Sequence, residues 1–230
     1  MKRMGVLGGV SAQATMDFEA RVHRISQQLI PQRVNEGYPP MVVWYHRRPP
    51  IRMDADRRPT VPREIDPGMV EAARWLGKAV DFLVIPCNAA HVGVDAVREA
   101  AGCPVLSMID VAIEDVVRRG CRRVGVTGFA GAPGVYVEPL RARKIAVATI
   151  DDRAQTALDA AIHAVAEGRD GAVETAVARS AVGALRGQTV DGIVLGCTEI
   201  PLMLREEDAA PDLIDPLALL AEAAVRFAIA

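Results

Sequence analysis

Two segments of the chain recur, in the same order, in its second half. The run MGVLGG at 4–9 is answered by VGVTGF at 124–129, and FLVIPCNAAH at 82–91 by GIVLGCTEIP at 192–201. In each copy an apolar run enters a glycine turn, and a later apolar run stops at a cysteine followed by a polar residue. The repeat predicts two lobes of one fold, with Cys87 and Cys197 at equivalent strand ends, where open α/β sheets bind ligands.

Short apolar runs alternate with longer segments of helical periodicity along the chain, as in α/β proteins with parallel sheets. We expect strands at 3–8, 41–45, 82–86, 104–107, 124–128, 145–150 and 192–196. We expect helices at 12–29, 68–79, 110–119, 153–167, 172–185 and 217–228. The predicted fold is α/β, with two pseudo-symmetric, Rossmann-like lobes of mostly parallel sheet.

The repeat also suggests the domain organisation. The first lobe is expected to span 1–107 and to carry Cys87, and the second to span 108–211 and to carry Cys197. The C-terminal helix, within 212–230, is expected to return to the first lobe. Each lobe is then long enough to bury a core of its own.

The charge balance favours a small ligand over a macromolecular one. The chain has 27 Lys and Arg against 29 Asp and Glu, a net charge of −2, which offers no electrostatic footprint for nucleic acid or an anionic membrane. No apolar run approaches the roughly 18 residues of a membrane span, and the N-terminus does not read as a signal peptide. We therefore expect a cytoplasmic protein that binds a small molecule.

The sequence offers no familiar cofactor or metal motif. The first glycine turn lacks the GxGxxG spacing, the second strand ends at His46 rather than at an acidic residue, and no P-loop sequence occurs. His91 follows Cys87 by four residues, but no third or fourth metal ligand is evident. We therefore expect neither cofactor nor metal, and we expect His91 to orient the cysteine turn by hydrogen bonding. The glycine turn itself has two open interpretations: a tight strand-to-helix connection, or an anion site made by free N–H groups.

The four cysteines differ in context. Cys87 and Cys197 each lie where a strand gives way to a helix, a position that favours thiolate because helix N-termini stabilise negative charge. Cys103 and Cys121 have no such context, and we expect them to pack in the core. A single cysteine of this kind is more often a core residue. The repeat, however, presents two thiols at matching strand ends, which is the arrangement needed to hold a small molecule from opposite faces, so we favour a functional role for Cys87 and Cys197.

An Arg- and Pro-rich segment at 47–63 has no periodicity and is expected to be a loop. Such a run is usually a solvated surface strip. Arginine is also the side chain best suited to bidentate binding of a carboxylate, and the loop leaves the second strand on the same edge as Cys87. We expect one of these arginines in the site, although the residues alone do not say which.

These motifs, taken together, resemble those of the aspartate/glutamate racemase family, which is related to hydantoin racemases and arylmalonate decarboxylases. GVLGGVSAQAT, PCNAAH, GCTEIPLML and LIDPLALLAEAAV resemble family segments in order and spacing along the whole chain. The resemblance implies two pseudo-symmetric α/β lobes, an active site in the cleft between them, and catalytic cysteines at Cys87 and Cys197. It places Asn88 and Thr198 at the substrate α-carboxylate and Arg52, in Pro50-Ile51-Arg52, at a distal carboxylate.

The resemblance also implies substrate contacts at Ser11 and Ala89 and a homodimeric assembly. Two departures concern specificity. Ala89 stands where the family commonly has Thr, and a substrate-binding Lys of some aspartate racemases is replaced by Ala166 or Glu167. Loss of a cation weakens recognition of a second carboxylate.

The predicted function is thus a cofactor-independent amino-acid racemase that interconverts the L and D forms of aspartate or a related acidic amino acid by a two-thiol mechanism. The alternatives within the enzymes are a racemase, a decarboxylase or a cis-trans isomerase of another small carboxylic acid. Two intact cysteines argue against the decarboxylase. A non-catalytic protein that binds small anions is the alternative outside the enzymes.

Overall fold

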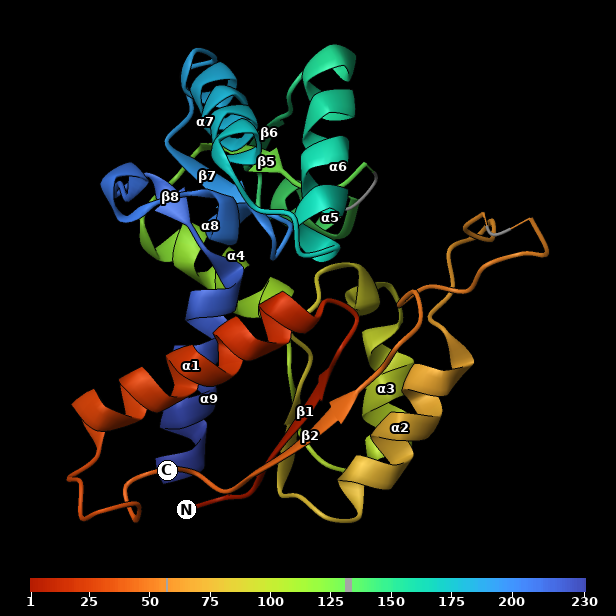
Figure 1. Ribbon diagram of the computed structural model, residues 1–230, viewed down its shortest axis with the longest axis vertical. Helices are drawn as coiled ribbons and strands as arrows, with labels where there is room; N and C mark the ends of the chain where they lie inside the picture. Colours follow the sequence, from red (N-terminus) through yellow and green to blue (C-terminus); the bar gives the residue numbers. More distant parts are fainter. Residues whose placement is uncertain (57, 131–133) are drawn as a thin grey trace. The chain divides into compact units, whose positions relative to one another are not determined.

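The computed structural model describes residues 1–56, 58–130 and 134–230 and forms two compact units (Figure 1). Unit 1 consists of Met1–Met108 and Leu217–Ala230, and unit 2 of Ile109–Pro216. Each unit contains a sheet of four parallel strands. The α/β fold with parallel sheets is therefore confirmed.

The sheet of unit 1 has the strand order β2-β1-β3-β4. Its strands are β1 (Met4–Gly8), β2 (Met41–Tyr45), β3 (Phe82–Val84) and β4 (Val105–Leu106). The helices of this part of the chain are α1 (Ala12–Leu29), α2 (Pro67–Gly77), η1 (Ala89–Gly93), α3 (Val94–Ala101) and α9 (Pro216–Ile229). Ser11 caps α1 through its side chain, and Asp66 caps α2, whose first residue is a proline that needs no N–H partner.

The sheet of unit 2 repeats this order as β6-β5-β7-β8. Its strands are β5 (Arg123–Thr127), β6 (Ala146–Ala148), β7 (Gly192–Leu195) and β8 (Leu213–Ile214). The helices are α4 (Met108–Arg118), α5 (Gly134–Ala142), α6 (Asp152–Ala166), α7 (Ala172–Arg186), α8 (Ile200–Met203) and η2 (Glu206–Asp208). The repeated segments β1 and β5 hold the same place in their sheets, as do β3 and β7, which confirms the internal repeat.

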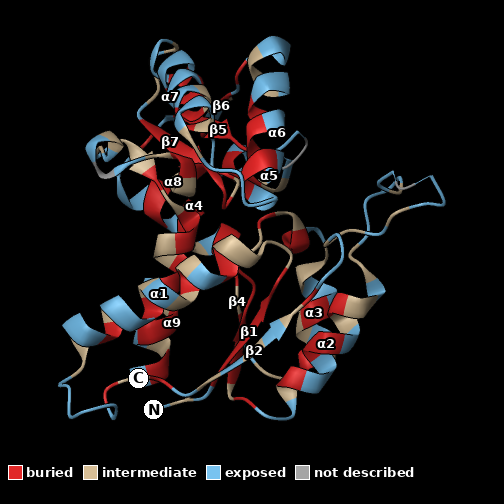
Figure 2. Cartoon of the chain, in the orientation of Figure 1, coloured by how far each residue is buried: buried red, intermediate tan, exposed pale blue. Residues whose placement is uncertain are grey.

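Each unit has an apolar core between its sheet and its helices (Figure 2). The central strands β1, β3 and β7 are buried throughout, as expected for parallel strands covered on both faces. In unit 1, α9 packs on the sheet, with the rings of Phe82 and Phe227 4.8 Å apart and the Lys2 N–H donating to Ala228 O at 2.8 Å. Each fully buried side chain of this size stabilises the fold by about 1.5–3 kcal/mol.

Several elements differ from those expected from the sequence. The strands expected at 104–107 and 145–150 contain only two and three residues, and β8, α3 and α5 were not predicted. The helix α5 begins with Gly134 and contains Pro139, so its sequence lacks the usual helical signals. Within the described residues, no helix combines the length and the apolar character needed to cross a membrane.

Candidate active site

Cys87 lies directly beyond the buried strand β3, at the carboxyl edge of the unit 1 sheet. The chain leaves the strand through Ile85 and Pro86, and the Cys87 N–H donates back to Ile85 O at 2.8 Å. The next residues are Asn88, which is buried, and Ala89, which begins η1. The structure therefore brings Cys87, Asn88 and Ala89 together in one turn, with the cysteine half-buried.

His91 fixes the backbone of this turn. Its buried Nε2 accepts a hydrogen bond from the Met108 N–H at 3.1 Å, so Nε2 carries a lone pair and the ring proton is on Nδ1. Nδ1 is 2.9 Å from Cys87 O and therefore donates to it. The prediction that His91 orients the cysteine turn is confirmed.

The first glycine turn, between β1 and α1, is a tight connection. Gly9 has φ +81°, and a Cβ there would lie 2.3 Å from Tyr45 Cα, so no other residue fits. The Gly9 N–H donates to Thr15 Oγ1 at 2.8 Å, and Ser11 Oγ accepts from the Ala14 N–H at 3.3 Å. Two of the N–H groups are thus occupied within the turn, which favours the structural interpretation, and the role of Ser11 towards a substrate stays a prediction.

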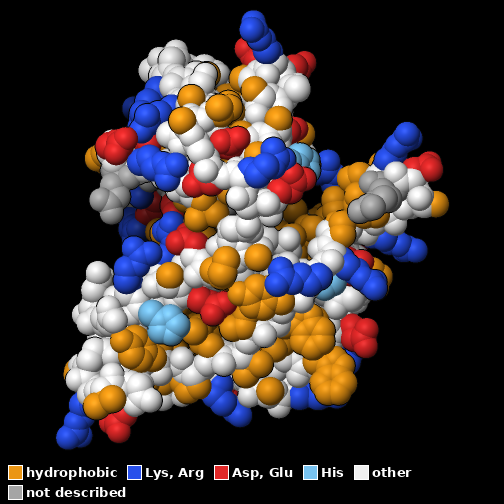
Figure 3. All heavy atoms as spheres, in the orientation of Figure 1, with side chains coloured by type: hydrophobic (Ala, Val, Ile, Leu, Met, Phe, Trp, Pro, Cys, Tyr) orange, Lys and Arg blue, Asp and Glu red, His pale blue; other side chains and the backbone are white. Residues whose placement is uncertain are grey.

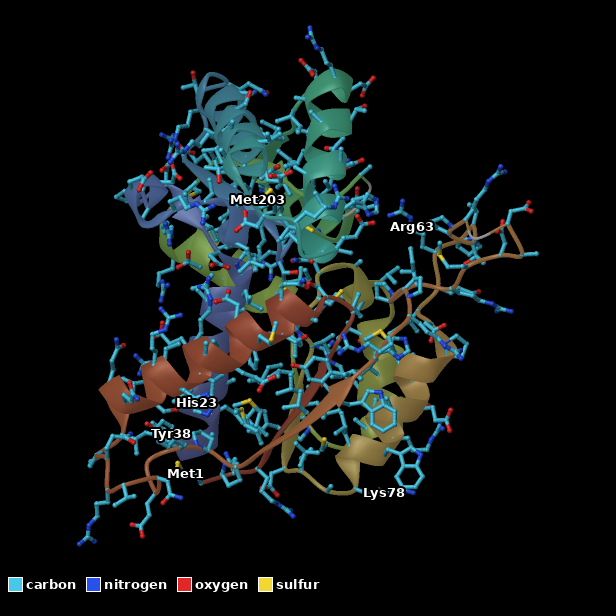
Figure 4. All side chains as sticks on the ribbon, viewed as in Figure 1. Met1, His23, Tyr38, Arg63, Lys78 and Met203 are labelled. Carbon is cyan, nitrogen blue, oxygen red and sulfur yellow. The ribbon has the colours of Figure 1, made fainter. Side chains whose placement is uncertain are left out.

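Arg52 lies in an arm that connects β2 to α2. The arm doubles back on itself through bridges between Ile51 and Ile65 and between Met53 and Pro59, and Figure 4 shows Arg63 on the same arm. The Arg52 guanidinium is 3.1 Å from Glu64 Oε2 and is 58% exposed. The ion pair therefore engages Arg52 within its own arm, and its contact with a substrate stays a prediction. Arg57, also in the predicted loop, lies outside the described residues.

Cys197 follows β7 in unit 2 as Cys87 follows β3 in unit 1. Its Sγ donates a hydrogen bond to Glu199 Oε2 at 2.9 Å, and Thr198 Oγ1 donates to the same oxygen at 3.2 Å. Thr198 and Glu199 are both buried. A thiol and a hydroxyl thus converge on one buried carboxylate oxygen, and this arrangement holds a proton on the sulfur.

The surroundings of Cys197 raise its pKa well above the usual value for a thiol. Burial is the largest cause, followed by the charge and the hydrogen-bond acceptor of Glu199. Backbone N–H groups of Phe129 and Glu199 act in the opposite direction and favour the thiolate. The expectation that the position of Cys197 before a helix favours the thiolate is therefore wrong for this residue, because α8 has only four residues and the sulfur donates a hydrogen bond to the Glu199 carboxylate.

A close approach of two strand ends sets the position of Cys197. The Gly196 N–H donates to Thr127 O at 2.6 Å, and a Cβ on Gly196 would lie 2.6 Å from that oxygen and 3.3 Å from Tyr136 Cε2. Tyr136 is fully buried, and its pKa is raised by burial and by the nearby charges of Asp215 and Cys197. Its phenol therefore stays protonated, and its ring packs beside Gly196 in the turn.

The Gln155 side chain of α6 reaches these strand ends, where it also donates to Asp159 Oδ1 at 2.7 Å. Its Nε2 donates to Gly128 O at 2.8 Å, and Gly128 lies beside Gly196 at the end of β5. Ala166 and Glu167, by contrast, are exposed at the end of α6, about 18 Å further along the helix axis. The structure therefore places a neutral amide, rather than position 166 or 167, at the carboxyl edge of this sheet.

The described residues contain no group of three or more His, Cys, Asp and Glu placed to hold a metal ion. A depression of about 670 Å³ lies on α7, lined in part by Thr175, Arg179 and Arg205. Its arginine Arg179 is paired with Glu207 and Asp208. The depression includes none of the predicted site residues.

The pattern of the Asp/Glu/Hydantoin racemase family matches residues 7–224. The chain belongs to this family. It is 29% identical over 114 residues to a broad-specificity amino-acid racemase of Bacillus subtilis, covering 49% of this chain and 48% of that protein. It is 30% identical over 142 residues to the glutamate racemase of Aquifex aeolicus, covering 59% of this chain and 53% of that one. The matches thus span about half the length of these curated relatives.

The fold is also that of solved members of the racemase family. An aspartate racemase homologue from Pyrococcus horikoshii superposes with a TM-score of 0.77 at 21% identity, covering 100% of both chains. Among the site residues, sequence reasoning missed roles for Glu199, Tyr136 and Gln155. Glu199 carried a signal, since it follows Cys197 by two residues in the quoted GCTE motif. Tyr136 and Gln155 carried none, because only the tertiary fold brings them to the turn.

Proposed function

We propose that the chain is a cofactor-independent amino-acid racemase that interconverts the L and D forms of aspartate or a related acidic amino acid. Cys87 and Cys197 are the two acid/base groups. The observation that carries the proposal is the hydrogen bond from Cys197 Sγ to Glu199 at the end of β7. A thiol held as a proton donor in unit 2, and a second cysteine in the equivalent turn of unit 1, meet the chemical needs of a two-base racemase.

In the proposed reaction one thiolate removes the α-proton, so the Cα–H bond breaks and an S–H bond forms. The opposite thiol gives its proton to the other face of the same carbon, which leaves it as a thiolate. Since Glu199 favours the protonated form of Cys197, that cysteine acts as the acid for the enantiomer whose α-proton Cys87 removes, and the two roles are exchanged for the other enantiomer. The N–H groups of Phe129 and Glu199 then stabilise the Cys197 thiolate that the step produces.

Substrate recognition is assigned to groups near these turns. Asn88 and Thr198, each directly after a catalytic cysteine, bind the α-carboxylate, and Arg52 binds the distal carboxylate once it leaves Glu64. Ser11 and Ala89 contact the same substrate. The Ala89 methyl group and the Gln155 amide are neutral and give a second carboxylate no charged partner. The rates with related acidic and neutral amino acids should therefore be compared with the rate with aspartate.

A screen of L- and D-amino acids in deuterated water, followed by loss of the α-proton signal, tests the activity without assuming a product. The screen uses protein dialysed against a chelator, with no added pyridoxal or nicotinamide. We expect exchange and racemisation of at least one acidic amino acid. Absence of exchange with every amino acid would refute the racemase, and activity that returns only with a metal or cofactor would refute cofactor independence.

The cysteine roles are tested by Cys87→Ala and Cys197→Ala, with Cys103→Ala and Cys121→Ala as matched controls. Inversion needs a donor on the face opposite the base, so each catalytic variant is expected to lose racemisation. Each is also expected to retain deuterium exchange of one enantiomer only. Racemisation near the wild-type rate in either variant would remove its cysteine from the mechanism.

A further inference from the structure

One face of α6 holds the backbone of residues 128–130, which follow β5. Gln155 and Asp159 are four residues apart on α6 and therefore lie on the same face of the helix. Gln155 Nε2 donates to Gly128 O at 2.8 Å, and Asp159 Oδ1 accepts from the Ala130 N–H at 3.0 Å. The two side chains thus engage the backbone on both sides of the residue between them.

Asp159 also fixes the orientation of the glutamine amide. Its Oδ1 accepts a hydrogen bond from Gln155 Nε2 at 2.7 Å, so the same nitrogen meets the carboxylate and the Gly128 carbonyl. Both partners are acceptors, and only the NH₂ end of the amide can serve them. Figure 3 shows acidic and basic side chains mixed over the surface of α6 and α7, whereas Asp159 is half-buried and bonded to this network.

His163 extends the same face of α6 by a further turn. Its ring meets the Phe129 ring edge-on, with the centroids 5.0 Å apart and the planes at 83°, which is a favoured aromatic geometry. The side chain of Phe129 therefore lies on α6, between the two backbone contacts made by Gln155 and Asp159.

The peptide between Gly128 and Phe129 connects this face of α6 to the cysteine. In a trans peptide the carbonyl and the N–H point in opposite directions. Because Gly128 O faces Gln155, the Phe129 N–H points away from α6, and it is one of the backbone groups that favour the thiolate of Cys197. A donor at the carbonyl also polarises the peptide and strengthens its N–H as a donor.

The same peptide is packed closely against the cysteine turn. A Cβ on Gly128 would lie 2.8 Å from Gly196 O and 3.4 Å from Cys197 N. The peptide is thus held between α6 and the turn. A change in the α6 contact would therefore alter the direction in which the N–H points.

We propose that Gln155, oriented by Asp159, is a positioning residue that directs the Phe129 N–H to the sulfur of Cys197. The inference rests on the proposed function, in which this sulfur alternates between thiol and thiolate. Glu199 accepts the thiol proton and favours the protonated form. The amide of Gln155 acts in the opposite direction, through the peptide, and favours the thiolate.

The test is the alkylation of Cys197 by iodoacetamide, followed on its own peptide by mass spectrometry at a pH below the midpoint of the reaction. There the rate is proportional to the thiolate fraction. Gln155→Met keeps the length of the side chain but has no N–H donor. A hydrogen bond to a charged group corresponds to about one pKa unit or more, so the rate is expected to fall about tenfold. In turnover, kcat should fall while KM stays near the wild-type value.

Variants of Asp159 separate the hydrogen bonds from the charge. Asp159→Ala removes the acceptor that orients the amide and is expected to slow alkylation in the same direction as Gln155→Met. Asp159→Asn keeps an oxygen for both donors and should restore a rate near that of the wild type. Asp152→Ala, at an exposed carboxylate at the start of α6, is the matched control and should leave the rate unchanged.

A wild-type alkylation rate in Gln155→Met would overturn the proposal. Equal slowing in Asp159→Ala and Asp159→Asn would overturn it as well, because asparagine retains the acceptor. If Asp159→Ala unfolds, Gln155→Met decides by itself. The alkylation is independent of turnover, so a protein that shows the expected pattern but racemises no amino acid would refute the proposed function and leave the positioning role standing.

Discussion

Replacement of Glu199 by Gln tests how the active thiol of unit 2 is controlled. The substitution keeps the size and the hydrogen-bonding oxygen of the side chain but removes its charge. In the structure that charge lies 2.9 Å from Cys197 Sγ and raises the pKa of the thiol in addition to the effect of burial. The pKa of Cys197 is therefore expected to fall in Glu199→Gln.

The expected loss of activity follows from the strength of this contact. A hydrogen bond to a charged group contributes about 1.5–3 kcal/mol, and each 1.36 kcal/mol changes a rate tenfold. Glu199→Gln should therefore lower kcat/KM roughly 10- to 100-fold. The factor must be the same for both enantiomers, because the equilibrium constant of racemisation is one. The alkaline limb of the pH profile should move to lower pH, since the thiol loses its proton earlier.

The assay that reports on Cys197 alone is its rate of alkylation by iodoacetamide, measured by mass spectrometry of its peptide across pH. Only the thiolate reacts, so the midpoint is expected at lower pH in Glu199→Gln than in the wild type. Glu207→Gln, at an exposed carboxylate of the same unit, is the control and should leave the midpoint unchanged. An unchanged midpoint in Glu199→Gln would refute the view that this carboxylate keeps the proton on the sulfur.

Three further substitutions test other contacts. His91→Leu removes the acceptor of the buried Met108 N–H and the hydrogen bond to Cys87 O, so the free energy of unfolding in urea should fall by about 1–3 kcal/mol, together with activity; equal stability would contradict the role of His91 in holding the turn. Gly196→Ala places a carbon 2.6 Å from a β5 carbonyl oxygen and should lower the melting temperature, whereas Gly183→Ala, with open space on α7, should raise it; similar shifts in the two would be unexpected. Arg52→Lys keeps the charge but not the planar fork, so KM for an acidic substrate should rise; unchanged kinetics in Arg52→Ala would exclude the arm from binding.

The repeated segments allowed the fold to be predicted from sequence to an unusual degree. Buried parallel strands are continuous apolar runs, and a duplicated order of strand, glycine turn and cysteine can be recognised without coordinates. The same signal located Cys87 and Cys197, because both lie where an apolar run stops. His91 was predicted to hold its turn, since a spacing of four residues is a local property.

The state of the thiols and the surroundings of the turns depended on the tertiary structure. The pKa of Cys197 is set by burial and by a carboxylate rather than by a helix N-terminus, and neither effect can be evaluated from the cysteine's own segment. Tyr136 and Gln155 come from other helices. The short strand β8 and the free edge of β2 likewise depend on which strands become neighbours, and strand order is decided by packing over the whole unit, which the local sequence does not contain.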